Sequence, residues 1–130
     1  MNDVKYKIRV IRGAFVDPSV IDRLGAVLIE KINDPEWQSI DELVVDLDQI
    51  KELQKSMIKH SVSDKAPWYL DGYEVDNKDK LIVAFGSDDG ENGKIYELDR
   101  NDKDTRLEII NYGISRGIPK DQMSFADKDF

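Results

Sequence analysis

The sequence predicts an α+β fold: a four-stranded, mainly antiparallel sheet packed with about three helices, in the order β-α-α-β-β-β-α. Three observations predict this class. An alternating segment near the start indicates a strand, helical apolar spacing between residues 17 and 60 indicates two helices, and short strand-like segments after residue 68 indicate a meander followed by a third helix. The length of 130 residues suits a single globular domain, 1–130, with one core.

The first predicted strand is residues 4–12, where apolar and basic side chains alternate. Val4, Tyr6, Ile8 and Val10 fall on one face, and lysine and arginine side chains fall on the other. A period of two residues is typical of a half-buried strand. Its basic face is interpreted as that of a strand kept soluble by lysine side chains, as at a sheet edge, and the alternative is a docking surface for a partner.

A first helix is predicted from Asp17 to about residue 33. Asp17 is a suitable N-cap and Pro18 fits the first helical position. Apolar residues then recur at helical spacing, although Gly25 inside the run costs up to about 1 kcal/mol of helix propensity. The apolar positions are Ile21, Leu24, Val27, Leu28 and Ile32.

A second helix is predicted from Ser39 to about His60. Ser39 and Glu42 form the S-x-x-E pattern of a capping box, and Asp46 offers a second start with Gln49 as its partner. An alternative reading makes residues 43–47 a buried strand.

Strands return after Trp68, as "WYLDGYEV", "KLIVAFG" and "KIYELD". Residues 81–85 are apolar at every position, which is typical of a central strand covered on both faces. We expect the second face to be covered either by aromatic side chains of neighbouring strands or by a partner.

A last helix is predicted from residue 101, capped by Asn101 or Asp102 and stopped by Gly117. The tail, about 119–130, is expected either to dock on the core or to fray. The predicted core face of this last helix consists of Leu107, Ile110 and Ile114.

Composition limits the class of function. The 27 acidic and 19 basic side chains give a formal net charge of −8, so nucleic acid is an unfavourable partner and a basic protein is a favourable one. The absence of cysteine excludes thiolate zinc sites and disulfides. No leader and no long apolar run is visible, which predicts a cytoplasmic protein without membrane contact.

The segment "GSDDGENGKI", residues 86–95, is the one candidate for cation binding. Asn-Gly at 92–93 is a strong hairpin-turn signal, and the match to a calcium loop fails at two ligand positions. We therefore expect a hairpin tip with no metal and no cofactor. The weaker alternative is a cation site built from Asp88, Asp89, Glu91 and Asn92.

Aromatic side chains gather at residues 66–73. Strand alternation places Tyr69 and Tyr73 on one face and Trp68 on the other. We expect Trp68 in the core and the two tyrosines to be accessible. The acidic neighbours Asp71 and Glu74 disfavour base stacking. Tyr69, Tyr73, Asp71 and Glu74 are therefore the candidate partner-binding residues.

The sequence contains no P-loop, G-x-S-x-G or H-E-x-x-H motif, which disfavours an enzyme. We expect a small acidic interaction protein: a regulator, an inhibitor, an immunity-type protein or an accessory subunit. The alternative is an enzyme or a small-ligand-binding domain with a pocket between sheet and helices. That pocket would use Tyr69, Tyr73, Asp71 and His60.

Overall fold

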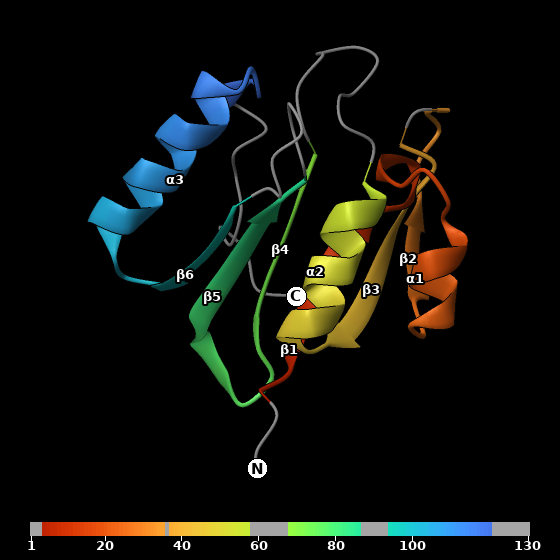
Figure 1. The fold of residues 1–130 in the computed structure, drawn as a ribbon, viewed down its shortest axis with the longest axis horizontal. Helices are drawn as coiled ribbons and strands as arrows, with labels where there is room; N and C mark the ends of the chain where they lie inside the picture. The colour runs from red at the N-terminus through yellow and green to blue at the C-terminus, as the bar shows by residue number, and fades with distance from the viewer. Residues whose placement is uncertain (1–3, 36, 58–67, 87–93, 121–130) are drawn as a thin grey trace.

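The computed structural model describes residues 4–35, 37–57, 68–86 and 94–120. Over these ranges the fold is α+β, as predicted, but the sheet has six strands and not four, in the order β2-β3-β1-β4-β5-β6, with every pairing antiparallel (Figure 1). The strands are β1 Tyr6–Ile11, β2 Val27–Lys31, β3 Ser39–Val45, β4 Tyr69–Glu74, β5 Asn77–Phe85 and β6 Ile95–Asp99. The helices are α1 Ser19–Arg23, α2 Leu47–Ser56 and α3 Lys103–Ser115, with a 3₁₀ turn at Arg12–Ala14.

The two extra strands lie where long helices were predicted. The first predicted helix ends after Arg23, because Gly25 adopts φ 88°, a conformation that favours glycine and ends helices. Ala26 N then donates to Ile21 O at 3.0 Å and closes the turn. The chain continues as β2, so the helical spacing of its apolar residues was misleading.

The second predicted helix begins instead as strand β3. The Ser39 hydroxyl donates to Asp41 Oδ1 at 2.6 Å inside the protein and caps no helix. Arg12 Nη2 donates to Asp41 Oδ2 at 2.8 Å, which gives this buried carboxylate a cationic partner. The strand alternative for residues 43–47 is therefore right as far as Val45.

Helix α2 starts at the second cap that the sequence offered. Gln49 N donates to Asp46 Oδ1 at 2.8 Å, and Asp46 N donates to Gln49 Oε1 at 2.9 Å, which is a complete capping box. The helix then packs Ile50 and Leu53 into the core. Local capping chemistry thus separates a strand from a helix within one apolar segment.

Two hydrophobic clusters lie on opposite faces of the sheet. Ile82 and Ala84 of β5 belong to the cluster under α1 and α2, and Val83 and Phe85 belong to the cluster under α3. The prediction that β5 is covered on both faces is confirmed. Helix α3 provides the second cover, together with Tyr69, Tyr96 and Tyr112.

Helix α3 is capped by Asp102 and stopped at Gly117, which has φ 99°. Its predicted core face is right at Ile110, which packs against the buried cluster, and wrong at Leu107 and Ile114. Ile109 and Gly113 face the sheet, and Leu107 and Ile114 lie on the exposed side. The apolar residues surround this helix, so spacing alone does not identify its buried side.

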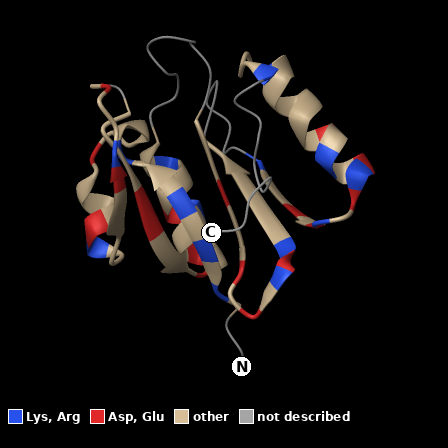
Figure 2. Cartoon of the chain, turned by 180° about the vertical axis from the view of Figure 1, so that it is seen from behind, with Lys and Arg blue, Asp and Glu red and all other residues tan. Residues whose placement is uncertain are grey.

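In the view of Figure 2, acidic and basic residues are interspersed along the described elements. None of the described helices is long and apolar enough to cross a membrane.

Candidate functional site

The predicted aromatic site is only partly accessible. Tyr73 is buried, with Lys78 Nζ 5.8 Å from the centre of its ring, so the expectation that it is exposed is wrong. Tyr69 is half-buried against Phe85, at 5.6 Å between ring centres. Trp68 is buried in the core, as predicted. A partner-binding role for the tyrosines stays a prediction.

The four predicted partner-binding residues do not share one surface. Tyr69, Asp71 and Tyr73 alternate onto the α3 side of the sheet, where Tyr73 is aligned with Lys7 of β1. Glu74 points to the other side, where it is aligned with Tyr6. The structure therefore separates Glu74 from the other three.

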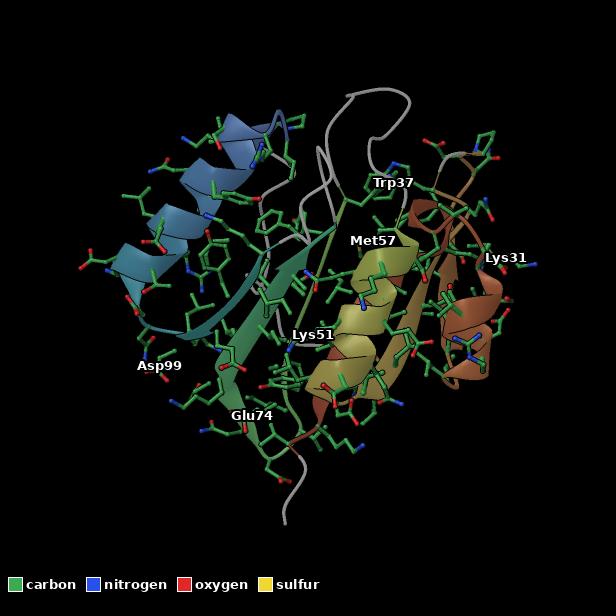
Figure 3. The ribbon with its side chains drawn as sticks, viewed as in Figure 1. Lys31, Trp37, Lys51, Met57, Glu74 and Asp99 are labelled. Carbon is green, nitrogen blue, oxygen red and sulfur yellow. The ribbon has the colours of Figure 1, made fainter. Side chains whose placement is uncertain are left out.

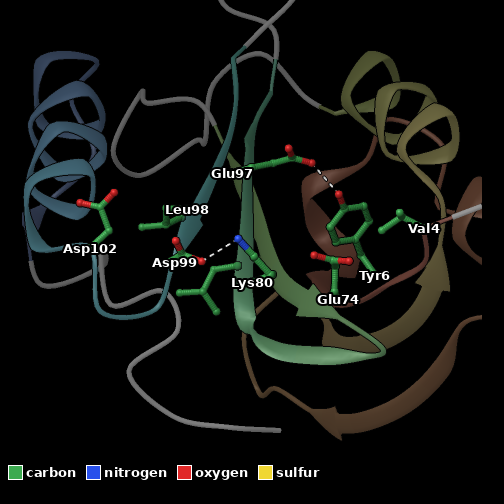
Figure 4. Close-up of a pocket in the computed structure, with 9 residues that line it drawn as sticks. Val4, Tyr6, Glu74, Lys80, Glu97, Leu98, Asp99 and Asp102 are labelled. Atoms are coloured by element: carbon green, nitrogen blue, oxygen red, sulfur yellow. Dashed lines mark hydrogen bonds and ion pairs between the residues drawn. The ribbon is translucent and has the colours of Figure 1, made fainter.

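Glu74 instead lines a pocket of about 480 Å³ at one end of the sheet (Figure 4). The residues that line the pocket come from neighbouring strands and from the start of α3. Glu74 and Asp99 lie at this end of the sheet in Figure 3. Four acidic side chains and one basic side chain contribute to the lining, which consists of Val4, Tyr6, Glu74, Lys80, Leu81, Glu97, Leu98, Asp99 and Asp102.

Tyr6 and Glu97 form a hydrogen bond across the inner side of the pocket. Tyr6 Oη donates to Glu97 Oε1 at 2.5 Å, between residues 91 positions apart in the chain. Burial raises the pKa of the Tyr6 hydroxyl, and so do this hydrogen bond and the negative charges of Glu97 and Glu74. The hydroxyl therefore remains a proton donor that holds Glu97 in place.

Lys80 and Asp102 have partners at the edge of the pocket. Lys80 Nζ lies 2.8 Å from Asp99 Oδ1, and this hydrogen bond raises the pKa of Lys80. Asp102 is the N-cap of α3: it accepts hydrogen bonds from Thr105 Oγ1 at 2.6 Å and from Thr105 N at 3.0 Å. Those bonds, the side-chain one first, lower the pKa of Asp102. Both groups are therefore ionised at neutral pH.

Glu74 has no hydrogen-bond or ion-pair partner within the described part of the chain. Acidic groups outnumber the single amine in this pocket, so its chemistry favours a cationic group. Among the described residues, no three acidic or histidine side chains are arranged to hold a metal ion.

A second pocket, of about 570 Å³, lies between β6 and α3. Lys94 Nζ lies 4.6 Å from the ring centre of Tyr112 and covers one side of it. The ring of Tyr96 contacts the same ring at 5.9 Å between centres, with an angle of 58° between the two planes. This pocket combines aromatic faces with an amine.

Sequence reasoning identified Glu74 but missed Tyr6, Lys80, Glu97, Asp99 and Asp102 as site residues. The charged positions of "KIYELD" were a signal for one side of the pocket, but no local pattern links them to Tyr6. The acidic loop (Asp88, Asp89, Glu91, Asn92), His60 and residues 121–130 lie outside the described residues. Cytoplasmic location also stays a prediction.

The sequence matches no protein-family model and no curated protein, and no solved structure matches the fold.

Proposed function

We propose that this protein acts by binding another protein, and that the partner inserts a basic side chain into the acidic pocket. The observation that supports this proposal is the lining of the pocket, in which Glu74, Glu97, Asp99 and Asp102 surround one amine, Lys80. A lysine or arginine side chain forms charge-assisted hydrogen bonds with such carboxylates. The acidic balance of the whole chain, with a net charge of −8, would also speed the approach of a basic partner.

Glu74 is the residue best placed to contact the incoming cation. Glu97 is engaged by Tyr6, Asp99 by Lys80, and Asp102 by Thr105, whereas Glu74 has no such bond within the described chain. It therefore loses no existing hydrogen bond when a partner binds. Binding of this kind suits a regulator, an inhibitor, an immunity-type protein or an accessory subunit.

Affinity purification from the native host, followed by mass spectrometry, tests this proposal. We expect the wild-type chain to recover a basic protein in a fixed ratio, and Glu74→Lys to lose it. The matched control is Glu108→Lys, the same charge change at an exposed position on α3 that does not line this pocket. Since the contact is between charges, recovery should also fall as salt rises. Recovery of the same partner by Glu74→Lys would contradict the proposal.

A small-ligand-binding domain is the second candidate function, and the pocket between β6 and α3 favours it. The tilted rings of Tyr96 and Tyr112 and the amine of Lys94 would suit a flat anionic ligand. NMR titration with aromatic carboxylic acids tests this function. Saturable shifts at Tyr96 that disappear in Tyr112→Ala would support it, and shifts spread over the whole surface would contradict it.

A further inference from the structure

Strand β2 is an edge strand with unusual exposure. All five of its residues are exposed, and three of them are consecutive apolar residues: Val27 at 61%, Leu28 at 50% and Ile29 at 42%. It pairs only with β3 and forms one margin of the sheet (Figure 1). An edge with exposed apolar residues is a template for a further strand.

The exposed apolar residues of β2 do not form one face. Val27 is aligned with Glu42 and Leu28 with Asp41, and consecutive residues of a strand project to opposite sides of the sheet. A partner lying on one face would therefore cover only one of the two side chains. A strand added beside β2 would contact both, because its own side chains also alternate.

The charge on β2 permits a second copy of the same acidic chain to approach. The opposite charges of Glu30 and Lys31 balance at the end of the strand. The other margin of the sheet, β6, exposes Glu97 and Asp99; Asp99 is paired with Lys80, and the charge of Glu97, which has no cationic partner among the described ion pairs, opposes association of two copies there. Each copy has a net charge of −8, so two copies repel each other overall. This repulsion is weakest at the margin formed by β2, where the charges of Glu30 and Lys31 balance.

We propose that two copies of this chain associate by antiparallel pairing of their β2 strands around a two-fold axis at Leu28. In this register Leu28 is opposite Leu28, and Val27 meets the partner strand near Ile29, the residue at the register irregularity of β2, so apolar residues meet apolar residues. The two Glu30 side chains are then about 13 Å apart and the two Lys31 side chains about 20 Å apart, at ~3.3 Å per residue. Both separations exceed the screening length of about 8 Å in physiological salt.

The register irregularity between Leu28 and Glu30 and the turn at Gly25 keep this pairing short. We therefore expect a weak dimer that forms at high protein concentration. The inference does not rest on the acidic pocket, because β2 and β6 are at opposite margins of the sheet and the pocket would stay open. Lys31 and Asp99 mark these two sides in Figure 3.

Sedimentation equilibrium of the full chain, from about 10 µM to about 1 mM, tests the dimer. The average mass should rise from 14.9 kDa towards about twice that value. Leu28→Lys should remain at the monomer mass, since it places a charge at the two-fold axis. The matched control is Leu107→Lys on α3, where the leucine is 57% exposed, and it should associate like the wild type. Ile29→Lys serves as a second variant if circular dichroism shows that Leu28→Lys is unfolded.

Four results would overturn the inference: a monomer mass at every concentration, association that survives both β2 substitutions, equal loss in Leu107→Lys, or a mass that keeps rising beyond the dimer. The outcome is separable from that of the proposed function. Glu74→Lys should leave the dimer intact, and Leu28→Lys should leave capture of the basic partner intact.

Discussion

The two halves of the sheet are built differently. In the half formed by β4, β5 and β6, both faces are covered, and β5 is apolar at five consecutive positions that are all buried. In the half formed by β1, β3 and β2, the described residues cover only the side of α1 and α2, and β3 alternates between buried and more exposed residues. Alternation of apolar and polar residues along a strand therefore indicates that one face is covered, and a continuous apolar run indicates that both faces are covered.

On the face of the second half that the described residues leave uncovered, basic side chains of β1 form ion pairs with Glu42 of β3. Lys7 Nζ lies 3.5 Å from Glu42 Oε1, and Arg9 Nε lies 3.3 Å from Glu42 Oε2. Partly exposed ion pairs of this kind contribute about 0–1 kcal/mol each. We therefore expect the stability of the protein to reside mainly in the doubly covered half and in the covered face of the other half.

The largest effect should come from Phe85, in the doubly covered half. Phe85 is fully buried and packs on Tyr69, Tyr96 and Tyr112. Phe85→Ala should cost about 3–5 kcal/mol through lost burial and the cavity that remains. Urea melts would measure this, and a loss below about 1 kcal/mol would mean that α3 does not pack firmly on this face.

A smaller effect should come from the covered face of the other half. Asp41 is buried and accepts hydrogen bonds from Arg12 and Ser39. Arg12→Met should cost about 2 kcal/mol, because it leaves a buried carboxylate with the serine alone. The double variant Arg12→Met/Asp41→Leu provides the control, since removing both partners should recover part of the loss in the same melts.

Tyr6→Phe tests the bond that joins the two halves. It should cost about 1.5 kcal/mol at pH 7 through loss of the hydrogen bond to Glu97. The folded protein raises the pKa of Tyr6 above its ordinary value of 10.0. Stability from this group is thus complete below about pH 10 and is lost as pH rises further, because the unfolded chain releases the proton first. Melts between pH 7 and 11 should show the wild type approaching the variant above pH 10. A constant difference would contradict this pKa shift.

The smallest effect should come from the face that the described residues leave uncovered. Val44 is 54% exposed on β3, so Val44→Thr should change stability by less than about 0.5 kcal/mol. Val44 lies on the same side of the sheet as Phe85, the side of α3, so the two substitutions compare the two halves on one face. A cost above about 1 kcal/mol would show that this face is covered in solution, and the comparison between the halves would then fail.

Strands with one clear period and helices with one clear cap could be predicted from the sequence. β1, β5 and the cap and stop of α3 are such cases. Residues 27–32 and 39–45 could not, because their apolar positions fit a helical and an extended pattern equally well. At Ser39 the deciding group is Asp41, whose carboxylate accepts hydrogen bonds from the serine hydroxyl and from Arg12, which is 29 positions away in the chain.

The acidic pocket could not be predicted from the sequence, for a different reason. Its residues come from β1, β4, β5, β6 and the start of α3, and they meet only through the order of strands in the sheet. Glu74 was identified because it follows two tyrosines, yet strand alternation turns it away from Tyr73. Its neighbours are therefore set by topology and not by the chain around it.

The central position of β1 has a consequence for how the chain folds. β1 is the first strand in the chain, but its neighbours are β3 and β4, so it joins the β2–β3 hairpin to the β4–β5–β6 meander. The meander can form from local contacts, whereas pairing of β1 with β4 requires closure of a loop of more than fifty residues. We therefore expect the two hairpin units to gain structure first and docking on β1 to limit the folding rate. During synthesis, β1 leaves the ribosome before β4 has been translated, so its pairing with β4 can form only later.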